Sequence, residues 1–329
     1  MDAAVSGPAG GWVLGVDSGG SGLRIALAGV TGSGAVEPGW ETVTDGPVRT
    51  GGAGIDAEQL LERVLPATRS LLTRAGAAAR VTAVCVGAAG MATLGADLRE
   101  RLPAALEREF GVRRWALAAD AVTGYAGALG ERRGAVVAAG TGMIALGMDG
   151  GRWRRADGWG HLLGDSGSGA WIGQRGLAAA LRAYDGRTGG SSALLERAEL
   201  MFGPAGGLPG VVYPRSDRAA VLASFAPEVA ACAGGDEVAA GILTAAALEI
   251  ARSAAAVAPA GGEVALTGGL FRMGDPLLGP VRAELGRLLP GAAVTRSTGD
   301  PLAGALLIAG RIAAGGLRLP PDRGLLELG

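Results

Sequence analysis

Short apolar runs separated by glycine turns recur along the first third of the chain. Residues 12–17 (WVLGVD) and 23–28 flank the segment SGGSG, a pattern that predicts strand, tight turn and strand. Apolar residues at helical spacing predict a helix from 56 to about 74. The other elements expected before residue 120 are strands at 41–44, 81–86 and 115–119 and a helix at 96–110.

The same order then begins again. Residues 135–139 (AVVAA), the turn GTG and residues 143–148 repeat strand, turn and strand. The elements expected after them are a helix at 167–184, an alanine-rich helical region up to 257, strands at 263–266 and 293–295, and helices around 281 and at 302–314. Two copies of one α/β plan therefore predict a protein of two domains.

Composition narrows the class of protein. The chain has 329 residues, of which 49% are hydrophobic and 19% charged, so it can bury two cores. Its net charge of -1 provides no positive field for a nucleic acid or an anionic membrane, which favours a small-molecule partner. The first residues show no basic and apolar leader, so we expect a cytoplasmic protein without a membrane segment.

Individual residue types exclude further classes. The chain contains no lysine, which excludes a Walker A lysine, the strand lysine of protein kinases and Schiff-base chemistry. Cys85 and Cys232 lie far apart in apolar segments, which is typical of two buried thiols.

The glycine turns carry the candidate chemistry. A single turn of this kind is more typical of an ordinary hairpin, but three of them, at 19–22, 140–142 and 268–269, each follow an expected strand. Backbone N–H groups in such turns can approach phosphate oxygens closely. Asp17 beside the first turn can hold Mg²⁺, and Ser21 and Thr141 add hydroxyl donors. Two facing turns and a carboxylate predict a nucleotide clamp.

Several motifs, in order, resemble a known family. The segments GVDSGGSGLR, AADAVTGYA, VVAAGTGMIALG, DGWGHLLGDSGSGAWIG, ALTGGL and DPLAGALLIA resemble the N-acetylglucosamine kinase branch of the BadF/BadG/BcrA/BcrD ATPase-like group, within the actin, sugar kinase and Hsp70 superfamily. The resemblance runs from about residue 13 to 314. It implies an α/β fold of two ribonuclease-H-like domains with a nucleotide cleft between them.

The resemblance also implies domain ranges and a reaction. We expect a small lobe at 1–119, a second lobe at 120–298, and a closing helix and tail at 299–329 that packs back towards the first lobe. The implied reaction is ATP- and Mg²⁺-dependent phosphorylation of a hydroxyl, the 6-OH, of N-acetylglucosamine or a related amino sugar. A homodimer is compatible with it.

Each motif implies roles for particular residues. Asp120 corresponds to the catalytic carboxylate, and its alternative role is to cap the helix that follows. Asp17 corresponds to the magnesium ligand, with an Asx-type turn as its alternative role. The remaining implied positions are Gly19, Gly20, Ser21, Gly22, Gly140, Thr141, Gly142, Gly268 and Gly269 for ATP and its phosphates, and Arg49, Gly158, Asp165 and Ser168 for the sugar.

The segment GDSG also occurs around the nucleophile of trypsin-like proteases. Here His161, the only histidine of the chain, and Asp165 lie in the same short segment as Ser166. A triad needs three groups that converge in space, which one turn cannot readily supply. In the resembled family the position of Ser166 is usually glutamate, so we interpret GDSG as a variant of GDEG and His161 as a structural residue.

One departure from the family bears on the substrate. Arg49 stands where the family usually has an asparagine that contacts the sugar. A guanidinium pairs well with a carboxylate, so N-acetylmuramic acid, which carries one, is an alternative substrate. Glucosamine is a further alternative. The other role open to Arg49 is a surface ion pair. A different alternative is an ATPase activator with an iron–sulfur cluster, whose closely spaced cysteines are missing here. A sugar-sensing repressor would need a helix-turn-helix before the first strand.

Overall fold

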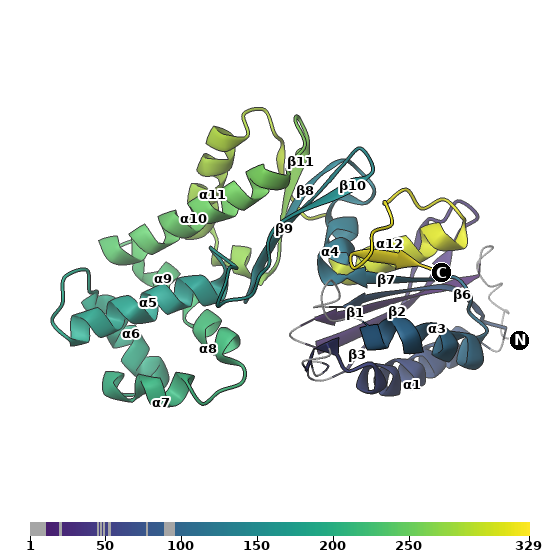
Figure 1. Ribbon diagram of the computed structural model, residues 1–329, viewed down its shortest axis with the longest axis horizontal. Coiled ribbons are helices and arrows are strands. Elements are labelled where there is room, and N and C mark those ends of the chain that lie inside the picture. Colours follow the sequence, from purple (N-terminus) through teal and green to yellow (C-terminus); the bar gives the residue numbers. More distant parts are fainter. Residues whose placement is uncertain are drawn as a thin grey trace, which may run out of the picture. The chain divides into compact units, whose positions relative to one another are not determined.

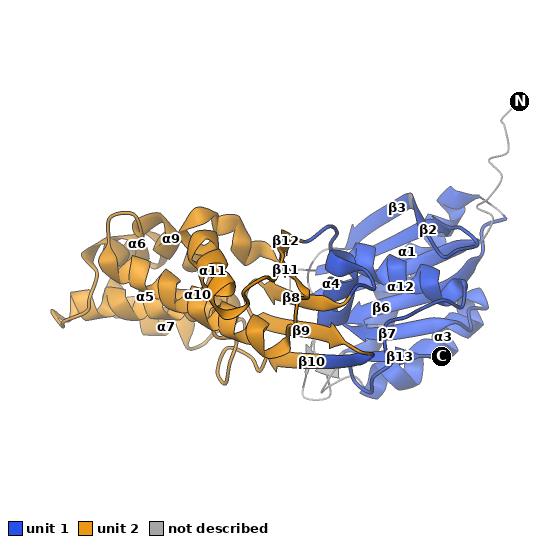
Figure 2. Cartoon of the chain, turned by 90° about the horizontal axis from the view of Figure 1, so that it is seen from above, with its two compact units in different colours: residues 1–132, 151–153, 297–329 blue, residues 133–150, 154–296 orange. Residues whose placement is uncertain are grey.

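The chain folds into two compact units in the computed structural model. The structure describes residues 11–19, 22–44, 46, 48, 50–51, 54–76, 78–88 and 96–329. Unit 1 comprises residues 1–132, 151–153 and 297–329, and unit 2 comprises residues 133–150 and 154–296 (Figure 2). Unit 1 is therefore assembled from three stretches of chain, and residues 297–329 return to it after unit 2.

Unit 1 is built on a mixed sheet of six strands (Figure 1). Strand β1 pairs antiparallel with β2 and parallel with β6, and β6 pairs parallel with β7. Apolar side chains on both faces make β1, β2 and β6 buried strands. In spatial order the strands are β13 (Leu326–Leu328), β7 (Trp115–Ala119), β6 (Val81–Ala88), β1 (Trp12–Gly19), β2 (Gly22–Val30) and β3 (Val36–Thr44).

Helices cover both faces of this sheet. Figure 1 shows α1 and α3 on one face and α4 and α12 on the other. Helix α12 packs on β1, β6 and α4, and a side chain at Gly15 of β1 would collide with Leu306. Asp17 lies two residues along the same strand, so it points to this α12 face. The elements outside the sheet are α1 (Ala57–Ala75), α3 (Ala96–Phe110), α4 (Asp120–Leu129), α12 (Pro301–Ala313) and the hairpin β4 (Thr50–Gly51) and β5 (Gly54–Ile55).

Unit 2 repeats the central pattern on a sheet of five strands. Strand β8 pairs antiparallel with β9 and parallel with β11, and β11 pairs parallel with β12. The antiparallel pair with a glycine turn between its strands therefore recurs beside a parallel strand, as in β1, β2 and β6. In spatial order the strands are β10 (Arg152–Asp157), β9 (Met143–Asp149), β8 (Gly134–Ala139), β11 (Glu263–Thr267) and β12 (Val294–Arg296).

The helical part of unit 2 is larger than that of unit 1. Helix α10 (Glu237–Val257) begins at Asp236, whose carboxylate accepts a hydrogen bond from Ala239 N at 2.7 Å. Its buried face packs on α11 and β9. The other helices are α5 (Gly169–Tyr184), α6 (Ser192–Phe202), η1 (Ala205–Gly207), α7 (Leu208–Val212), α8 (Arg218–Ser224), α9 (Ala226–Cys232), η2 (Gly269–Met273) and α11 (Asp275–Leu288).

Helix α10 also bears on the membrane question. Of the helices in the described ranges, it alone is long and apolar enough to cross a bilayer by length and composition. Leu243, Ala247 and Ile250 on it are fully buried among other apolar side chains of unit 2, so within this unit α10 is a core helix.

Most predicted elements are present. The strand expected at 41–44 extends back to Val36, and the alanine-rich helical region up to 257 consists of the helices α6 to α10. Strands β4, β5, β10 and β13 were not predicted, because β10 (RWRRAD) is mostly polar and the other three have only two or three residues each. The lobe boundaries at 120 and 299 stay a prediction; the compact units change at residues 133 and 297.

Candidate active site

The first glycine turn joins β1 to β2 in unit 1. Gly19 and Gly22 lie opposite each other where the two strands meet, and Gly20 and Ser21 lie outside the described residues. Asp17 pairs across the hairpin with Arg24. The pKa of Asp17 is raised to about 6, mainly by burial and also by the carboxylates of Asp120 and Asp300, while the charge of Arg24 opposes the increase.

Asp120 lies at the carboxyl end of β7 and is the first residue of α4. Its Oδ1 accepts a hydrogen bond from Ala121 N at 2.8 Å, so the carboxylate satisfies one N–H group of the first helical turn. Burial raises the pKa of Asp120 above its ordinary value, while the Ala121 bond opposes this increase. The local position therefore suits either of the two roles considered from the sequence, helix terminus or proton acceptor, and both can coexist.

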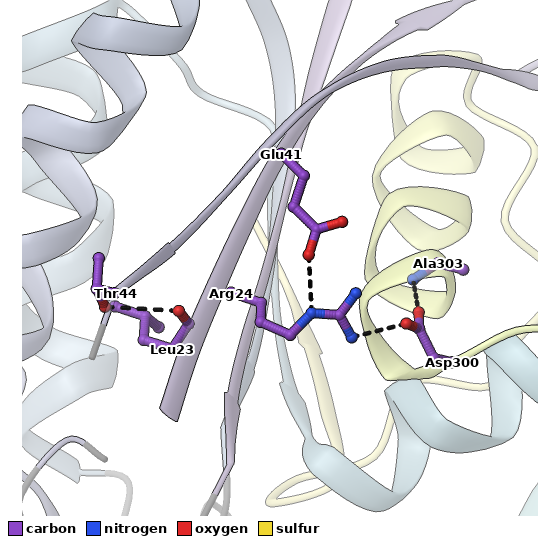
Figure 3. A network of polar contacts seen from close by, with 6 residues as sticks. All are labelled: Leu23, Arg24, Glu41, Thr44, Asp300 and Ala303. Carbon is purple, nitrogen blue, oxygen red and sulfur yellow. Dashed lines mark hydrogen bonds and ion pairs between the residues drawn. The ribbon is translucent and has the colours of Figure 1, made fainter. Parts of the chain in front are cut away.

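Arg24 connects two carboxylates of unit 1 (Figure 3). Its Nη1 donates to Asp300 Oδ2 at 2.6 Å and its Nε donates to Glu41 Oε1 at 2.9 Å. The other oxygen of Asp300 accepts from Ala303 N at 2.9 Å and so caps α12. Burial alone would raise the pKa of Asp300, but these N–H donors and the Arg24 charge hold it below its ordinary value.

The sequence analysis missed Arg24 and Asp300. Two signals could have found them: Arg24 lies across the hairpin from Asp17, and Asp300 followed by Pro301 is a typical helix start.

The residues of unit 1 are compatible with a divalent cation. The raised pKa of Asp17 reflects burial and two neighbouring carboxylates, a surplus of negative charge that a bound cation would relieve. The described residues contain no group of three or more acidic, histidine or cysteine side chains arranged as a complete metal site. Asp17 would therefore hold Mg²⁺ together with the phosphates and water, the usual coordination of this ion.

The second and third glycine turns meet in unit 2. Gly268 has φ +104°, and a side chain there would lie 2.1 Å from Ala139 O at the end of β8. Only glycine allows this approach. A cavity of about 340 Å³ is lined by Gly140 and Thr141 from the second turn and by Gly269 from the third. The structure thus brings three of the predicted nucleotide positions to one pocket, whose remaining walls come mainly from Ala220, Ala223 and Met273.

The predicted sugar residues of unit 2 lie in the loop between β10 and α5. Asp165 is buried, and burial raises its pKa, with opposing contributions from the N–H of Gly160 and from His161. Ser168 is fully buried and caps α5, since its hydroxyl accepts from Trp171 N at 3.2 Å. Gly158 has φ +75° at the start of the loop. Arg49, the fourth predicted sugar residue, lies outside the described residues.

We compared the sequence and the fold with those of known proteins. Residues 14–309 match the sequence profile of the BadF/BadG/BcrA/BcrD ATPase family. The chain belongs to that family. The predicted relationship is therefore confirmed.

The relatives of this family member include named sugar kinases. An N-acetylmuramic acid/N-acetylglucosamine kinase of Clostridium acetobutylicum is 37% identical over 119 residues, which span 35% of this chain and 37% of that enzyme. The structure of a protein from Chromobacterium violaceum, assigned as a candidate N-acetylglucosamine kinase, is 27% identical, with a TM-score of 0.69 over 90% of this chain and 98% of that one.

More distant structures support the fold. A candidate N-acetylglucosamine kinase of Porphyromonas gingivalis is 18% identical, with a TM-score of 0.66 over 92% of this chain and 98% of that one. Together with the two sheets and their covering helices, these similarities confirm the predicted two-domain α/β class of the actin-like sugar kinases.

Proposed function

We propose that this protein is a cytoplasmic, ATP-dependent amino-sugar kinase that phosphorylates the 6-OH of N-acetylglucosamine. The observation that carries the proposal is the 27% identity to the Chromobacterium violaceum protein over nearly the whole chain, together with a TM-score of 0.69. The Clostridium acetobutylicum relative supports the same substrate class over a shorter stretch.

ATP is proposed to bind unit 2 at the pocket of about 340 Å³. The backbone N–H of Thr141 would contact phosphate oxygens, since the N–H of Gly140 already donates to Gly142 O at 2.8 Å. Gly269 would lie on the adenosine side of the pocket. The apolar side chains of Ala223 and Met273 suit the face of a purine ring. In unit 1, the turn between Gly19 and Gly22 is a separate candidate for backbone contacts to phosphate oxygens.

Unit 1 is proposed to supply the charged groups. Mg²⁺ bound with the nucleotide would neutralise charge on the phosphates, and Asp17 would hold it directly or through water. Asp120 would accept the proton of the sugar hydroxyl while the hydroxyl oxygen attacks the γ-phosphorus in line. A pKa above the ordinary aspartate value brings Asp120 closer to that of an effective base near neutral pH.

The sugar is proposed to contact the loop of Gly158, Asp165 and Ser168. Asp165 is the residue best suited to accept hydrogen bonds from sugar hydroxyls, because it is buried and its carboxylate is fixed by a backbone donor at 3.0 Å. Ser168 already caps α5 with its hydroxyl oxygen, which leaves its O–H as a donor.

One screen tests the substrate proposal. ATP, Mg²⁺ and the purified protein are incubated separately with N-acetylglucosamine, N-acetylmuramic acid, glucosamine, N-acetylmannosamine and glucose, and phosphorylated products are identified by phosphorus and proton NMR. We expect the highest kcat/KM for N-acetylglucosamine and coupling of phosphorus to the C6 protons. Equal rates with every sugar, or ATP hydrolysis without a phosphorylated sugar, would contradict the proposal.

N-acetylmuramic acid is a second candidate substrate because of Arg49. A guanidinium in the sugar site would pair with the lactyl carboxylate. We expect Arg49→Asn to lower kcat/KM for N-acetylmuramic acid selectively, and equal changes for both sugars would abandon this role.

The activator alternative has less support. Cys85 is buried in unit 1 and Cys232 belongs to unit 2, and both are free thiols. A brown, iron-containing protein would favour that alternative over the kinase.

A further inference from the structure

Two aspartates, one at the end of β10 and one in the loop that joins β10 to α5, have a left-handed backbone conformation. Asp157 has φ +60° and Asp165 has φ +54°, and among the described residues they are the only ones other than glycine with positive φ. The left-handed region is unfavourable for most residues that carry a Cβ, although aspartate and asparagine tolerate it better than others. Contacts around the loop must therefore fix these two residues.

The carboxylate of Asp157 supplies the principal contacts. One oxygen accepts a hydrogen bond from Asp165 N at 2.5 Å and the other accepts from Ser166 N at 2.9 Å. Both acceptor oxygens of one side chain are thus used on two successive N–H groups, an arrangement stronger than neutral hydrogen bonds. Arg155 also fixes Asp157, because its Nε donates to the backbone carbonyl of Asp157 at 3.1 Å.

Asp165 in turn contacts the second glycine turn. Its Oδ1 accepts from Gly160 N at 3.0 Å, and a Cβ at Gly142 would lie 2.5 Å from its Oδ2. The chain then runs directly onto the turn, since Gly169 N donates to Gly140 O at 2.9 Å. A shift of the backbone at Asp165 would therefore move both a sugar contact and the phosphate turn.

The charge of Asp157 does not help Asp165 to ionise, so the contribution of Asp157 is to hold the backbone in position. A second carboxylate beside Asp165 makes ionisation of Asp165 harder, and Asp157 does contribute to the raised pKa of Asp165. The backbone N–H groups of Gly160 and Met143 and the charge of His161 oppose this increase in the pKa of Asp165.

We propose that Asp157 is a positioning residue of the sugar site, which holds the backbone of Asp165 and Ser166 so that the Asp165 carboxylate is presented to substrate. This inference rests on the proposed function, because it gives Asp165 the sugar as its partner. The sequence analysis did not single out Asp157.

Two substitutions separate the side chain from the backbone strain. Asp157→Gly removes both hydrogen bonds but favours the same φ, and Asp157→Asn tolerates that φ and retains one good acceptor. Asp149→Asn is the matched control, since Asp149 lies in the same unit at the end of β9 and pairs with Arg133 at 2.8 Å. All three proteins should unfold within a few degrees of the parent.

Steady-state kinetics give the first readout. We expect Asp157→Gly to raise the KM for the amino sugar about tenfold with a smaller change in the KM for ATP, and Asp157→Asn to restore much of the loss. In Asp165→Asn, adding Asp157→Gly should have little further effect, because the two residues act through one contact. Parent-like sugar KM in Asp157→Gly, or additive effects in the double variant, would overturn the proposal.

Amide hydrogen exchange gives a readout that does not depend on the reaction. Exchange at the N–H groups of Asp165 and Ser166 should be about tenfold or more faster in Asp157→Gly than in the parent, and unchanged in Asp149→Asn. Unchanged exchange at both amides in Asp157→Gly overturns the proposal. If the parent phosphorylates no amino sugar, the proposed function fails, and the exchange experiment still decides whether Asp157 fixes this backbone.

Discussion

The two units contain acidic clusters that are held in opposite ways. In unit 1, the carboxylates of Asp120 and Asp300 raise the pKa of Asp17, while the guanidinium of Arg24 lowers it and pairs with Asp300. In unit 2, Asp157 and Asp165 are held by backbone N–H groups, which are neutral and fixed in direction. The first cluster therefore includes a charged side-chain partner, Arg24, whereas backbone N–H groups hold the second.

This difference bears on how the clusters respond to ligands. The cluster in unit 1 has a surplus of negative charge, so a cation bound at Asp17 would change its electrostatics greatly. The carboxylates of the cluster in unit 2 accept backbone hydrogen bonds, so its energy depends on whether the loop keeps its conformation. We expect substitutions in unit 1 to alter kcat and the pH profile, and substitutions in unit 2 to alter KM.

The largest effect is expected from Asp120→Asn. Asparagine can still accept the bond from Ala121 N but cannot take a proton, so kcat should fall about 10²-fold or more while the fold is kept. The measurement is steady-state phosphorylation of the best amino sugar, with the circular dichroism spectrum as the check of folding. Asp97→Asn is the control, because Asp97 lies in the same unit and pairs with Arg101 at 2.7 Å. Near-normal kcat in Asp120→Asn would remove Asp120 from the reaction.

A smaller effect is expected from Arg24→Met. Arg24 is the principal group that lowers the pKa of Asp17, so its loss should raise that pKa above about 6. The acid limb of the profile of kcat/KM against pH should move to higher pH, with about tenfold lower activity at pH 6.5 and a smaller loss at pH 8.5.

Arg101→Met serves as the control for the Arg24 experiment, since it removes a guanidinium from an exposed ion pair of α3. A uniform loss of activity across the pH range in Arg24→Met would show that Arg24 acts through the Asp300 and Glu41 contacts alone.

Stability should change by a few degrees in Asp17→Asn. Because the pKa of Asp17 is about 6 in the folded protein and near 3.8 when unperturbed, ionisation of this group destabilises the folded state as pH rises through 6. With a chelator present to remove divalent cations, the free energy of unfolding of the variant at pH 8 should exceed that of the parent by roughly 1–3 kcal/mol. This range allows for the partial solvent exposure of Asp17. Thermal unfolding midpoints measured at pH 8 and pH 4.5 check this, and a gain that is equal at both values contradicts the assignment.

The smallest expected effect is the difference in thiol reactivity between Cys85 in unit 1 and Cys232 in unit 2. Cys85 is fully buried in β6, and burial raises its pKa strongly, whereas Cys232 at the end of α9 is partly exposed. A thiol reagent at pH 8 should label about one cysteine in the native protein, and Cys232→Ser should abolish that labelling. Rapid labelling of Cys85 would mean that unit 1 opens readily.

Residues whose roles depend on local sequence patterns could be predicted, whereas contacts between residues far apart in the chain could not. Asp17 and Asp120 could be predicted as acidic residues at strand ends, because apolar runs followed by a polar residue are local signals. Asp300 and Arg24 could not be paired, since 276 residues separate them. Asp157 was missed because its role depends on a left-handed turn that brings Asp165 N and Ser166 N to its carboxylate.

The glycine turns show the same limit. Their recurrence after strands predicted that 140–142 and 268–269 matter, and the structure brings Gly140, Thr141 and Gly269 to one pocket. The walls from Ala220 and Ala223 could not be predicted, because an alanine-rich helix gives no sequence signal of the ligand that it faces.

The divided course of unit 1 has a consequence for synthesis of the protein on the ribosome. Residues 297–329 supply α12 over β1, strand β13 beside β7, and Arg311 and Arg318, which both pair with the buried carboxylate of Glu131. Unit 2 is complete in the nascent chain before any of these residues is translated. The unit that begins first therefore finishes last, the reverse of the usual order in which N-terminal domains fold first. A polypeptide released before residue 297 retains the whole of unit 2 but leaves an apolar face of the first sheet bare, so such fragments should aggregate through unit 1.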